Sequence, residues 1–354
     1  MGGTGPIGEA LVQILSQTNL EVAVTSRSRD TINCNISYVK GNALDDVFLT
    51  SLLKKHNWDV IVDFMNYKTC IFKKRFDSLL ENTDQYIFIS SSRVYADGGV
   101  DALTEESPRL LNKVSSIDYL QSDEYALAKA RQEDLLFESP FNNWTVIRPY
   151  ITFDNQRLQL AIFEKEQWLH RILNHKTLIL PDSILRNQTT LTYSHDVALP
   201  IYIMIRDAIG LGEVYHICSS QDLSWMQIYD IYMSAIYQCL SFRPKTLFLD
   251  DTYLNKICPS AYQLKYDRKF HRRFNSAKII NATGVAIGTD VAKQLEQSTI
   301  EFLKNPIFRE LNIRNEAMLD VLANDPWSPR GLHTPKNWFR YLYHRLTIDS
   351  NHAI

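Results

Sequence analysis

Apolar and polar positions alternate along the first half of the chain in blocks that predict strands and helices in turn. Short apolar runs of the kind found in buried parallel strands predict strands at residues 21–25, 36–39, 59–64, 85–90 and 144–147. Helical segments are predicted between them, at residues 10–15, 46–55, 73–81 and around 125–129. This alternation is typical of an α/β fold with a doubly wound parallel sheet.

The pattern is less regular in the second half. Residues 158–173 predict one amphipathic helix, with Trp168 and Ile172 among its apolar positions. Short strands are expected at residues 176–181, 188–193 and 215–219, and helices at 197–206 and 226–240. A Pro/Gly-rich connector at 325–331 leads to an aromatic, basic helix at 335–345. We expect that helix to dock on the body of the protein, with subunit pairing or contact with a membrane surface as alternatives.

Composition indicates a globular chain of one large or two medium domains, with 354 residues of which 45% are hydrophobic and 22% charged. The net charge of −2 gives no basic field for nucleic acid or an acidic membrane. The five cysteines, Cys258 among them, are scattered and form no CxxC pair, which favours a reducing compartment without disulfides or zinc. The longest apolar run, 197–205, is too short to span a bilayer, and no signal peptide is present. We therefore expect a soluble, cytoplasmic protein that binds no metal.

The first eight residues carry a glycine pattern that indicates a phosphate-binding turn. MGGTGPIG places Gly2, Gly5 and Gly8 at GxxGxxG spacing, directly before the apolar run 10–15. Such a turn lets backbone N–H groups approach a pyrophosphate, and the helix behind it favours negative charge at its N-terminus. Gly2 would permit the tight turn, Gly5 the close approach and Gly8 the packing of helix on sheet.

A turn of this kind follows a buried apolar strand, and here only Met1 precedes Gly2. Losing about five apolar residues, at roughly 1.5–3 kcal/mol each, would remove an amount comparable with the stability of a whole domain, about 5–15 kcal/mol. We therefore expect the natural chain to start upstream of this sequence.

The residues after the predicted strand 21–25 bear on the choice of dinucleotide. An NAD-preferring site has an acidic side chain here for the ribose 2′-hydroxyl. This chain has Ser26 and Arg27, which suit a 2′-phosphate, so we predict NADP in preference to NAD. A solvated basic turn is the alternative.

Three side chains suggest acid/base chemistry on a carbonyl or hydroxyl group. The segment SSSRVY, residues 90–95, follows a predicted strand, and YALAK places Tyr125 and Lys129 four residues apart on one helix face. An ammonium beside a phenol lowers the phenol pKa from about 10, which makes it usable near neutral pH. A serine hydroxyl can hold the substrate oxygen at the same centre.

With these segments in this order, residues 1–305 resemble the extended short-chain dehydrogenase/reductase superfamily, in its NAD(P)-dependent sugar epimerase/dehydratase branch. The resemblance rests on GGTGPIG, SSSRVY, YALAK, the pair Arg148–Pro149 and the segments SHDVA (194–198) and YHICS (215–219). It implies an NAD(P)-binding Rossmann domain at residues 1–155 that lacks its first strand. A smaller α+β substrate lobe at 156–305 would interleave with the last Rossmann elements, and 306–354 would form a C-terminal helical extension.

The resemblance implies that Ser91 is the catalytic hydroxyl, that Tyr125 is the acid/base and that Lys129 binds the nicotinamide ribose and tunes Tyr125. Its implied cofactor positions are Gly2, Gly5, Pro6, Ile7, Gly8, Ser26, Arg27, Asn42, Ala43, Phe64, Met65, Asn66, Tyr125, Lys129, Pro149 and Tyr150. Candidate substrate positions are Ser92, Arg93 and Arg268.

Arg268, with Arg272 and Arg273, would clamp a diphosphate, because a guanidinium matches phosphate oxygens. A solvated basic turn or an RNA-facing patch are the alternatives.

Several residues depart from the family pattern. Asn42 stands where Asp is usual, Met65 where small residues are common, and Asp63 where many members have His. Dehydratases of this branch carry Asp-Glu directly after the catalytic Ser or Thr, whereas this chain has Ser92 and Arg93. We therefore favour epimerisation or carbonyl reduction over dehydration.

The predicted function is that of an NAD(P)-dependent oxidoreductase or epimerase acting on a nucleotide-activated sugar. We expect a homodimer that binds neither nucleic acid nor membranes. Two alternatives stay open. The same machinery would serve another small carbonyl substrate, or the fold would act as a non-catalytic RNA-binding or scaffold protein.

Overall fold

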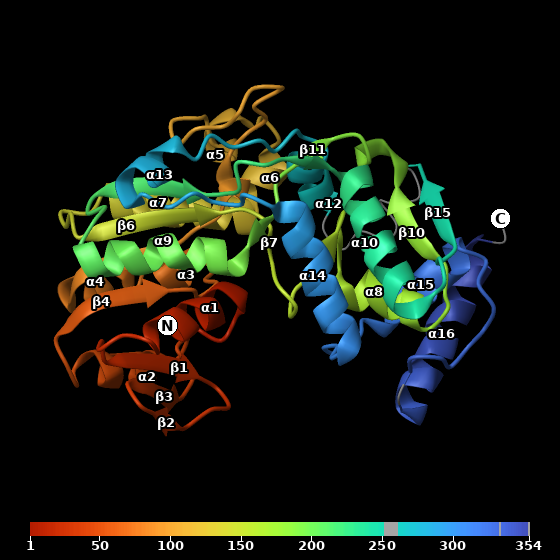
Figure 1. Ribbon diagram of the computed structural model, residues 1–354, viewed down its shortest axis with the longest axis horizontal. Coiled ribbons are helices and arrows are strands. Elements are labelled where there is room, and N and C mark those ends of the chain that lie inside the picture. The colour runs from red at the N-terminus through yellow and green to blue at the C-terminus, as the bar shows by residue number, and fades with distance from the viewer. Residues whose placement is uncertain (251–260, 333, 353–354) are drawn as a thin grey trace. The chain divides into compact units, whose positions relative to one another are not determined.

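The computed structural model describes residues 1–250, 261–332 and 334–352, so Cys258 lies outside the described residues. The chain divides into two compact units (Figure 1). Unit 1 comprises Met1–Thr152, Thr190–Asp222 and Arg272–Val291. Unit 2 comprises Phe153–Thr189, Leu223–His271 and Ala292–Ile354.

Unit 1 is built on parallel strands, as the apolar runs predict. Its larger sheet has the order β13-β6-β5-β4 and all its pairs are parallel. These strands are β4 (Trp58–Asp63), β5 (Thr83–Ile89), β6 (Trp144–Pro149) and β13 (Glu213–Ile217). A second sheet has the order β1-β3-β2, with β1 (Val22–Ser26) parallel to β3 (Ile36–Lys40) and β2 (Ile32–Asn33) antiparallel at its edge. The alternation of strands and helices confirms the predicted α/β class.

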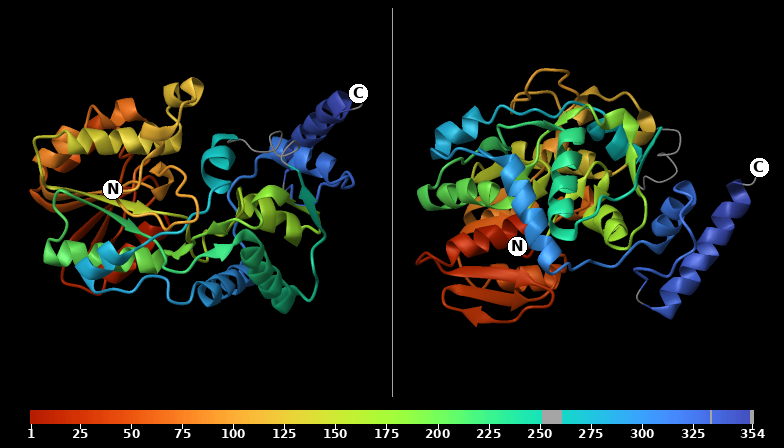
Figure 2. Two further views of the ribbon diagram at one scale, coloured as in Figure 1. Left: turned by 90° about the horizontal axis from the view of Figure 1, so that it is seen from above. Right: turned by 45° about the vertical axis from the view of Figure 1, so that its right-hand side comes forward.

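Helices cover both faces of these strands (Figure 2). The helices of unit 1 are α1 (Pro6–Leu15), α2 (Asp46–Leu53), α3 (Thr69–Phe72), α4 (Phe76–Glu81), η1 (Ser92–Val94), α5 (Leu110–Lys113), α6 (Ile117–Gln121), α7 (Tyr125–Phe137), α9 (Ser194–Asp207) and α13 (Ala277–Thr283). On β5, Ile87 and Ile89 pack with α1, α9 and α13, whereas Tyr86 and Phe88 pack with α2, α3, α4 and α7. The period-2 alternation of strand side chains thus fills two apolar layers.

Unit 2 combines short strands with helices. Its strands are β8 (Gln159–Leu160), β9 (Phe163–Glu164), β10 (Leu178–Pro181), β11 (Gln188–Thr189), β14 (Leu223–Ser224) and β15 (Thr246–Leu249). Strands β10 and β15 are parallel, while β8–β9 and β11–β14 are antiparallel. The helices that lie wholly or mainly here are α8 (Lys165–Leu173), η2 (Asp182–Ile184), α10 (Trp225–Leu240), α12 (Ala261–Gln263), η3 (Leu264–Arg268), α14 (Val291–Lys304), α15 (Ile313–Leu322) and α16 (Pro335–His352). The remaining short strands are β7 (Thr152–Phe153) and β12 (Thr192–Tyr193).

Two sequence predictions in the second half are wrong in detail. The single helix predicted at 158–173 is a β8–β9 hairpin followed by α8, and Ala161 turns the hairpin with φ of 55°. The single strand predicted at 188–193 is two short strands, β11 and β12. Neither turn contains the Gly or Asn that usually signals such a break.

Within the described residues, none of the helices combines the length and the apolar character that crossing a bilayer requires.

Candidate active site

The glycine turn adopts the shape that its spacing predicts. Gly2 has φ of +66°, a left-handed conformation that favours glycine, and its N–H donates to Thr25 Oγ1 at 2.9 Å. Gly5 is the N-cap of α1, Pro6 follows it, and a Cβ added at Gly5 would meet no atom within 4 Å. A Cβ at Gly8 would lie 2.6 Å from the backbone of Gly3, so α1 packs closely on the turn itself. The open space at Gly5, in front of the α1 N-terminus, fits an approaching pyrophosphate.

The predicted chemical residues follow the carboxyl ends of neighbouring parallel strands. Phe64–Asn66 follows β4, Ser91 follows β5, and Tyr150 follows β6. Because β4, β5 and β6 are consecutive and parallel, these segments lie along one edge of the sheet. Open α/β sheets bind their ligands at this edge.

Helix α7 presents Tyr125 and Lys129 one turn apart. Tyr125 is the first residue of α7, and the Glu124 carboxylate caps the helix by accepting the Ala126 N–H at 2.8 Å. Lys129 is only 2% exposed, and its Nζ donates to the carbonyls of Ile89 at 2.8 Å and Met65 at 3.2 Å. The lysine therefore connects α7 with the ends of β4 and β5.

Burial lowers the pKa of Lys129 to about 8, although the carboxylates of Asp63 and Glu133 act in the opposite direction. The Lys129 Nζ also lies 4.4 Å from the centroid of the Phe88 ring. The lowered pKa follows from the removal of the Lys129 ammonium from water.

The segment after β5 meets the first turn of α7. Ser91 Oγ accepts the Arg93 N–H at 3.2 Å, which fixes the start of η1. The Arg93 guanidinium lies 5.3 Å from the centroid of the Tyr125 ring and pairs with Glu124 at 2.7 Å. Sequence reasoning offered Arg93 only as a substrate residue, whereas the structure places its charge over the phenol.

No direct hydrogen bond joins the side chains of Ser91, Tyr125 and Lys129 to one another in the described parts of the chain. The structure brings their three segments together, and the catalytic roles of these side chains stay a prediction.

Asp63, at the end of β4, is a buried carboxylate to which sequence reasoning gave no role. It accepts hydrogen bonds from Tyr67 Oη at 2.9 Å, Tyr86 Oη at 2.7 Å and the Met65 N–H at 2.9 Å. Burial and the Asp63 charge raise the pKa of both tyrosines well above the usual value. The carboxylate thus fixes the turn 64–66 on which one of the Lys129 acceptors lies. The sequence feature that could have indicated this role is an acidic residue at the end of an apolar strand.

Glu133 continues the Tyr125–Lys129 stripe by one further turn and also went unnoticed. Its carboxylate accepts Arg148 Nε and Nη2, both at 2.8 Å, and Ser90 Oγ at 2.6 Å. Glu133 and Arg148 are both buried. This bidentate pair connects α7 to the ends of β5 and β6 and so fixes the position of α7 against these strands.

The predicted cofactor positions differ in accessibility. Ser26 is buried and its Oγ accepts the N–H groups of Ser28 at 3.3 Å and Arg29 at 3.0 Å, so it shapes the turn. Arg27 beside it is exposed. Asn42 is exposed, and Ala43 is buried with its carbonyl accepting Arg75 Nη1 at 3.0 Å.

Around the strand ends, Phe64 and Met65 are half-buried, Asn66 is exposed, and Pro149 and Tyr150 are buried. Ile7, next to the glycine turn, packs against the core layer that contains α1. A Cβ added at Gly2 would lie 2.8 Å from Met65 Sδ, so the Met65 side chain lies directly against the glycine turn.

Two predicted substrate residues are turned inward. Ser92 is buried in unit 1 and donates to the Arg148 carbonyl at 2.7 Å. Arg268 is buried in unit 2, where it donates to the Ala161 carbonyl at 3.1 Å and Gln159 Oε1 at 3.2 Å, and pairs with Asp267.

The neighbouring Arg272 is buried in unit 1 and donates to the carbonyls of Tyr95 and Ala96, whereas Arg273 is exposed. Among the residues described, no group of His, Cys, Asp and Glu is arranged to hold a metal ion.

The parallel strands with helices on both faces define a Rossmann-type α/β fold. Residues 2–171 match a protein family described as NAD(P)H-binding. No curated protein sequence matches the chain.

The chain is similar to solved structures of enzymes with the same fold. These include the Bordetella bronchiseptica enzyme WbmH in complex with NAD⁺, with a TM-score of 0.66 at 15% identity, covering 86% of this chain and 98% of that one. The dTDP-glucose 4,6-dehydratase of Bacillus anthracis, in complex with NAD, has a TM-score of 0.64 at 17% identity, and the match covers 86% of this chain and 96% of that one. The UDP-glucuronic acid 4-epimerase of Bacillus cereus, with UDP-glucuronic acid and NAD, has a TM-score of 0.65 at 15% identity, and the match covers 86% of this chain and 98% of that one. These structures share the Rossmann-type α/β fold that the sequence resemblance implies.

Proposed function

We propose that this chain is an NAD(P)-dependent epimerase or reductase that acts on a nucleotide-activated sugar. The observation that carries the proposal is the position of Tyr125 and Lys129 on α7, with Lys129 Nζ bonded to the ends of β4 and β5 beside Ser91. The family match of residues 2–171 supports a nicotinamide cofactor at this edge.

The residues present fit such a cofactor. The turn from Gly2 to Gly8 and the N-terminus of α1 would hold the pyrophosphate, since Gly5 leaves open space there. Asn42 and Ala43 would border the adenine, and Pro149 and Tyr150 the nicotinamide. When bound, the cofactor supplies hydride transfer at C4 of its nicotinamide ring.

The protein itself would move the proton and hold the substrate. Tyr125 would take a proton from a substrate hydroxyl, or give one to a carbonyl oxygen, while Ser91 holds that oxygen. The Arg93 guanidinium lies over the Tyr125 ring, and Lys129 lies one turn further along α7. An ammonium has three donors, and two of those on Lys129 are bonded to Ile89 and Met65, which leaves one for a ribose hydroxyl.

Epimerisation or reduction is a better fit than dehydration. Dehydration would need an acid and a base directly after the catalytic serine, but these positions hold Ser92 and Arg93. Ser92 is buried against the Arg148 carbonyl, and Arg93 pairs with Glu124. Neither side chain is available to remove a proton from a sugar carbon.

Within the same proposal, NADP is preferred over NAD, because the exposed Arg27 follows β1 with no acidic residue beside it to accept a ribose 2′-hydroxyl. We also propose that the chain forms a homodimer, which light scattering tests by measuring the molar mass in solution. Parallel assays with NADPH and NADH decide the cofactor, and panels of UDP- and dTDP-sugars against simple ketones decide the substrate class.

The decisive experiment replaces Tyr125 by Phe. The Tyr125→Phe variant should retain cofactor affinity, measured by fluorescence titration, and lose about a hundredfold or more of its turnover. Tyr237→Phe is the matched control, because Tyr237 is 52% exposed on α10, and it should change neither quantity. Undiminished turnover in the Tyr125 variant would refute the proposed mechanism.

A further inference from the structure

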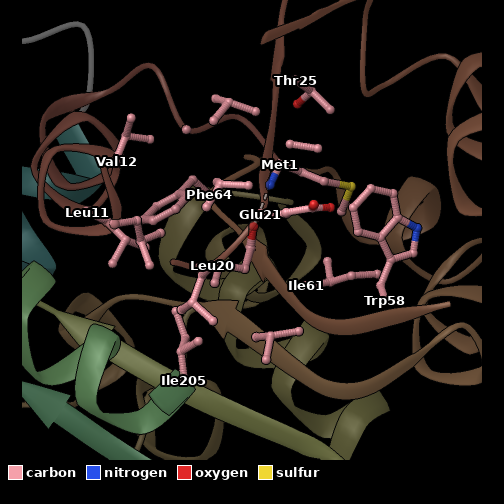
Figure 3. Close-up of a pocket in the computed structure, with 18 of the residues that line it drawn as sticks. Met1, Leu11, Val12, Leu20, Glu21, Thr25, Trp58, Ile61, Phe64 and Ile205 are labelled. Atoms are coloured by element: carbon pink, nitrogen blue, oxygen red, sulfur yellow. Dashed lines mark hydrogen bonds between the residues drawn. The ribbon is translucent and has the colours of Figure 1, made fainter. Parts of the chain in front are cut away.

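Helix α16 exposes three large apolar side chains, which we call the apolar stripe. Phe339 is 69% exposed, Tyr343 is 65% exposed and Leu346 is 59% exposed. By contrast, apolar side chains such as Leu11 and Ile61, which line a cavity of unit 1 (Figure 3), are buried. The members of the apolar stripe are three or four residues apart, so they adjoin on one side of α16. Adjoining apolar side chains at a surface mark a site of interaction.

The opposite face of α16 packs inside unit 2. Tyr341 is buried there, and Trp338, Leu342 and Ile348 pack with it against α15. α16 lies at the outside of unit 2, where its other face turns to solvent (Figure 2). The packing of this helix on the protein therefore uses one face and leaves the apolar stripe exposed.

A basic stripe, formed by Lys336, Arg340 and His344, runs beside the apolar one. Its members are four residues apart, so they share one side of the helix. Lys336 and Arg340 are exposed, and neither forms an ion pair with a carboxylate in the described part of the chain. Residues 335–348 contain no aspartate or glutamate. The exposed face of α16 is thus apolar along one side and cationic along the other.

The cations at this surface lie close enough to act on one another. Burial lowers the pKa of His344, and the guanidinium groups of Arg314 on α15 and of Arg340 lower it further. Arg314 is exposed as well. Positive charges that gather without a carboxylate repel one another, and an anionic partner would relieve that repulsion.

We infer that the exposed face of α16 docks on a lipid surface that carries anionic headgroups. The apolar stripe enters the boundary between headgroups and acyl chains, and the basic stripe stays at the level of the headgroups. Helices that lie in a membrane surface combine these two kinds of side chain. The net charge of −2 is an average over the whole chain and does not describe this local surface. The inference does not depend on the proposed catalytic function.

Two other partners fit this face less well. In a two-fold contact with a second copy of the chain, Lys336 and Arg340 would meet the same cations of the partner. RNA would neutralise the cations and stack on Phe339 and Tyr343, but Leu346 has no ring on which a base can stack. An anionic lipid surface uses both stripes.

Sedimentation with lipid vesicles tests the inference on the full chain. Vesicles of phosphatidylcholine alone are compared with vesicles of equal parts of phosphatidylcholine and phosphatidylserine. We expect the chain to bind the anionic vesicles only, with an affinity that falls by about tenfold or more at high salt.

One double variant reverses the charge of the basic stripe. Lys336→Glu combined with Arg340→Glu should weaken binding to the anionic vesicles by about tenfold or more. Lys54→Glu combined with Lys55→Glu is the matched control, because it makes the same kind of charge change at exposed positions of unit 1. The control should bind as the wild type does.

A second double variant removes apolar surface and keeps the charge. Phe339→Ser combined with Leu346→Ser should also weaken binding by about tenfold or more, because less apolar area enters the lipid. Val47→Ser combined with Ile117→Ser is its control, since these side chains of unit 1 are 80% and 68% exposed. Circular dichroism should show the same fold for all four variants, because every substituted side chain is exposed.

Four outcomes would overturn the inference. The first is the absence of vesicle binding, and the second is vesicle binding that the α16 variants leave unchanged or that neutral vesicles match. The third is retention of single-stranded RNA, without vesicle binding, that both α16 variants abolish. The fourth is a dimer in light scattering that Phe339→Ser with Leu346→Ser dissociates, again without vesicle binding, which would assign this face to a second copy.

Discussion

At the scale of single residues, Asp63 shows how a buried carboxylate can position a buried lysine to which it is not bonded. It accepts two tyrosine hydroxyls and the Met65 N–H, and the Met65 carbonyl in turn accepts Lys129 Nζ. The Asp63 side chain is fully buried, so no water is at hand to accept these hydrogen bonds in its place. Its removal leaves two buried tyrosine hydroxyls and the Met65 N–H without their acceptor.

We expect Asp63→Ala to lower the free energy of unfolding by about 3 kcal/mol, because each unsatisfied buried donor costs about 1–3 kcal/mol. Urea unfolding followed by circular dichroism measures the change. Tyr86→Phe, which removes one hydroxyl and keeps the carboxylate bonded to Tyr67, should cost only about 1 kcal/mol. Equal losses in the two variants would contradict this role for Asp63.

Lys129 should make stability depend on pH in a defined direction. Burial lowers its pKa in the folded protein to about 8 from the ordinary value of 10.5. Between these values the unfolded chain binds more protons than the folded chain, so stability rises with pH. The cost of the buried ammonium is fully present below pH 8 and is relieved above it.

We therefore expect the wild-type chain to gain about 2 kcal/mol relative to Lys129→Met between pH 7 and 9.5. Parallel denaturant titrations at several pH values give the difference. The same substitution at the exposed Lys73 is the control and should show no such trend. A flat difference for Lys129 would show that its pKa is not lowered.

The sequence indicated the site residues that stand close together in the chain. Tyr125 and Lys129 share a helix face by spacing alone, and Ser91 follows a clear strand. The partners of Asp63 were not predictable, because Tyr67 and Tyr86 lie on different elements and meet the carboxylate only after folding. The pairing of Arg148 with Glu133 was not predicted for the same reason, because the two residues are 15 positions apart on separate elements.

At the scale of elements, a buried ionic cluster holds the C-terminal helices α15 and α16 in unit 2. Arg171 of α8 donates to Glu316 at 3.1 Å, Asp320 at 2.7 Å and Asp325 at 2.9 Å. Lys176 donates to Glu316 and Asp320, and Tyr341 of α16 donates to Asp320 at 2.6 Å. Against burial, which raises it, Arg171 and Lys176 lower the pKa of Asp320.

We expect Arg171→Met to destabilise the chain by about 3–5 kcal/mol, because Glu316, Asp320 and Asp325 lose the guanidinium that they share and only Lys176 stays near the first two. Limited proteolysis should then cut near α15 and α16 well before it cuts the wild type. Arg340→Met, on the exposed side of α16, is the matched control and should behave as wild type. If both variants resist protease equally, the cluster does not hold these helices.

The sequence predicted several of the long helices, did not predict α14 or α15, and predicted the short strands of unit 2 poorly. The helices that became α7, α9, α10 and α16 have strong apolar periodicity or clear caps, such as Ser224 at the start of α10. The β8–β9 hairpin was read as helix because its apolar residues continue into the period of α8, and Ala161 gives no sign of a turn. Asp325 lies in a segment that reads as a loop, yet it is bonded to Arg171 and Thr177.

At the scale of the whole molecule, the chain builds unit 1 from three separated segments. β13 pairs with β6, and α9 and α13 supply Ile201, Met204 and Ile279 to the core layer that also contains Ile87 and Ile147. The family resemblance implied such an interleaving, whereas the sequence signals for a strand or a helix carry no information about which sheet receives it.

This arrangement predicts the fate of a fragment that ends where the first segment of unit 1 ends. Residues 1–152 retain the glycine turn, Ser91, Tyr125 and Lys129, but they lose α9, β13 and α13. Ile87, Ile89 and Ile147 would then be uncovered on one face of the sheet, at about 25 cal/mol for each Å² of apolar surface returned to water. We expect the fragment to bind a hydrophobic dye and to unfold without a cooperative transition, whereas the full chain should unfold cooperatively under the same conditions. A sharp thermal transition and a dispersed NMR spectrum for residues 1–152 would show instead that the first segment folds alone, and that α9, β13 and α13 are additions to a self-sufficient dinucleotide-binding unit.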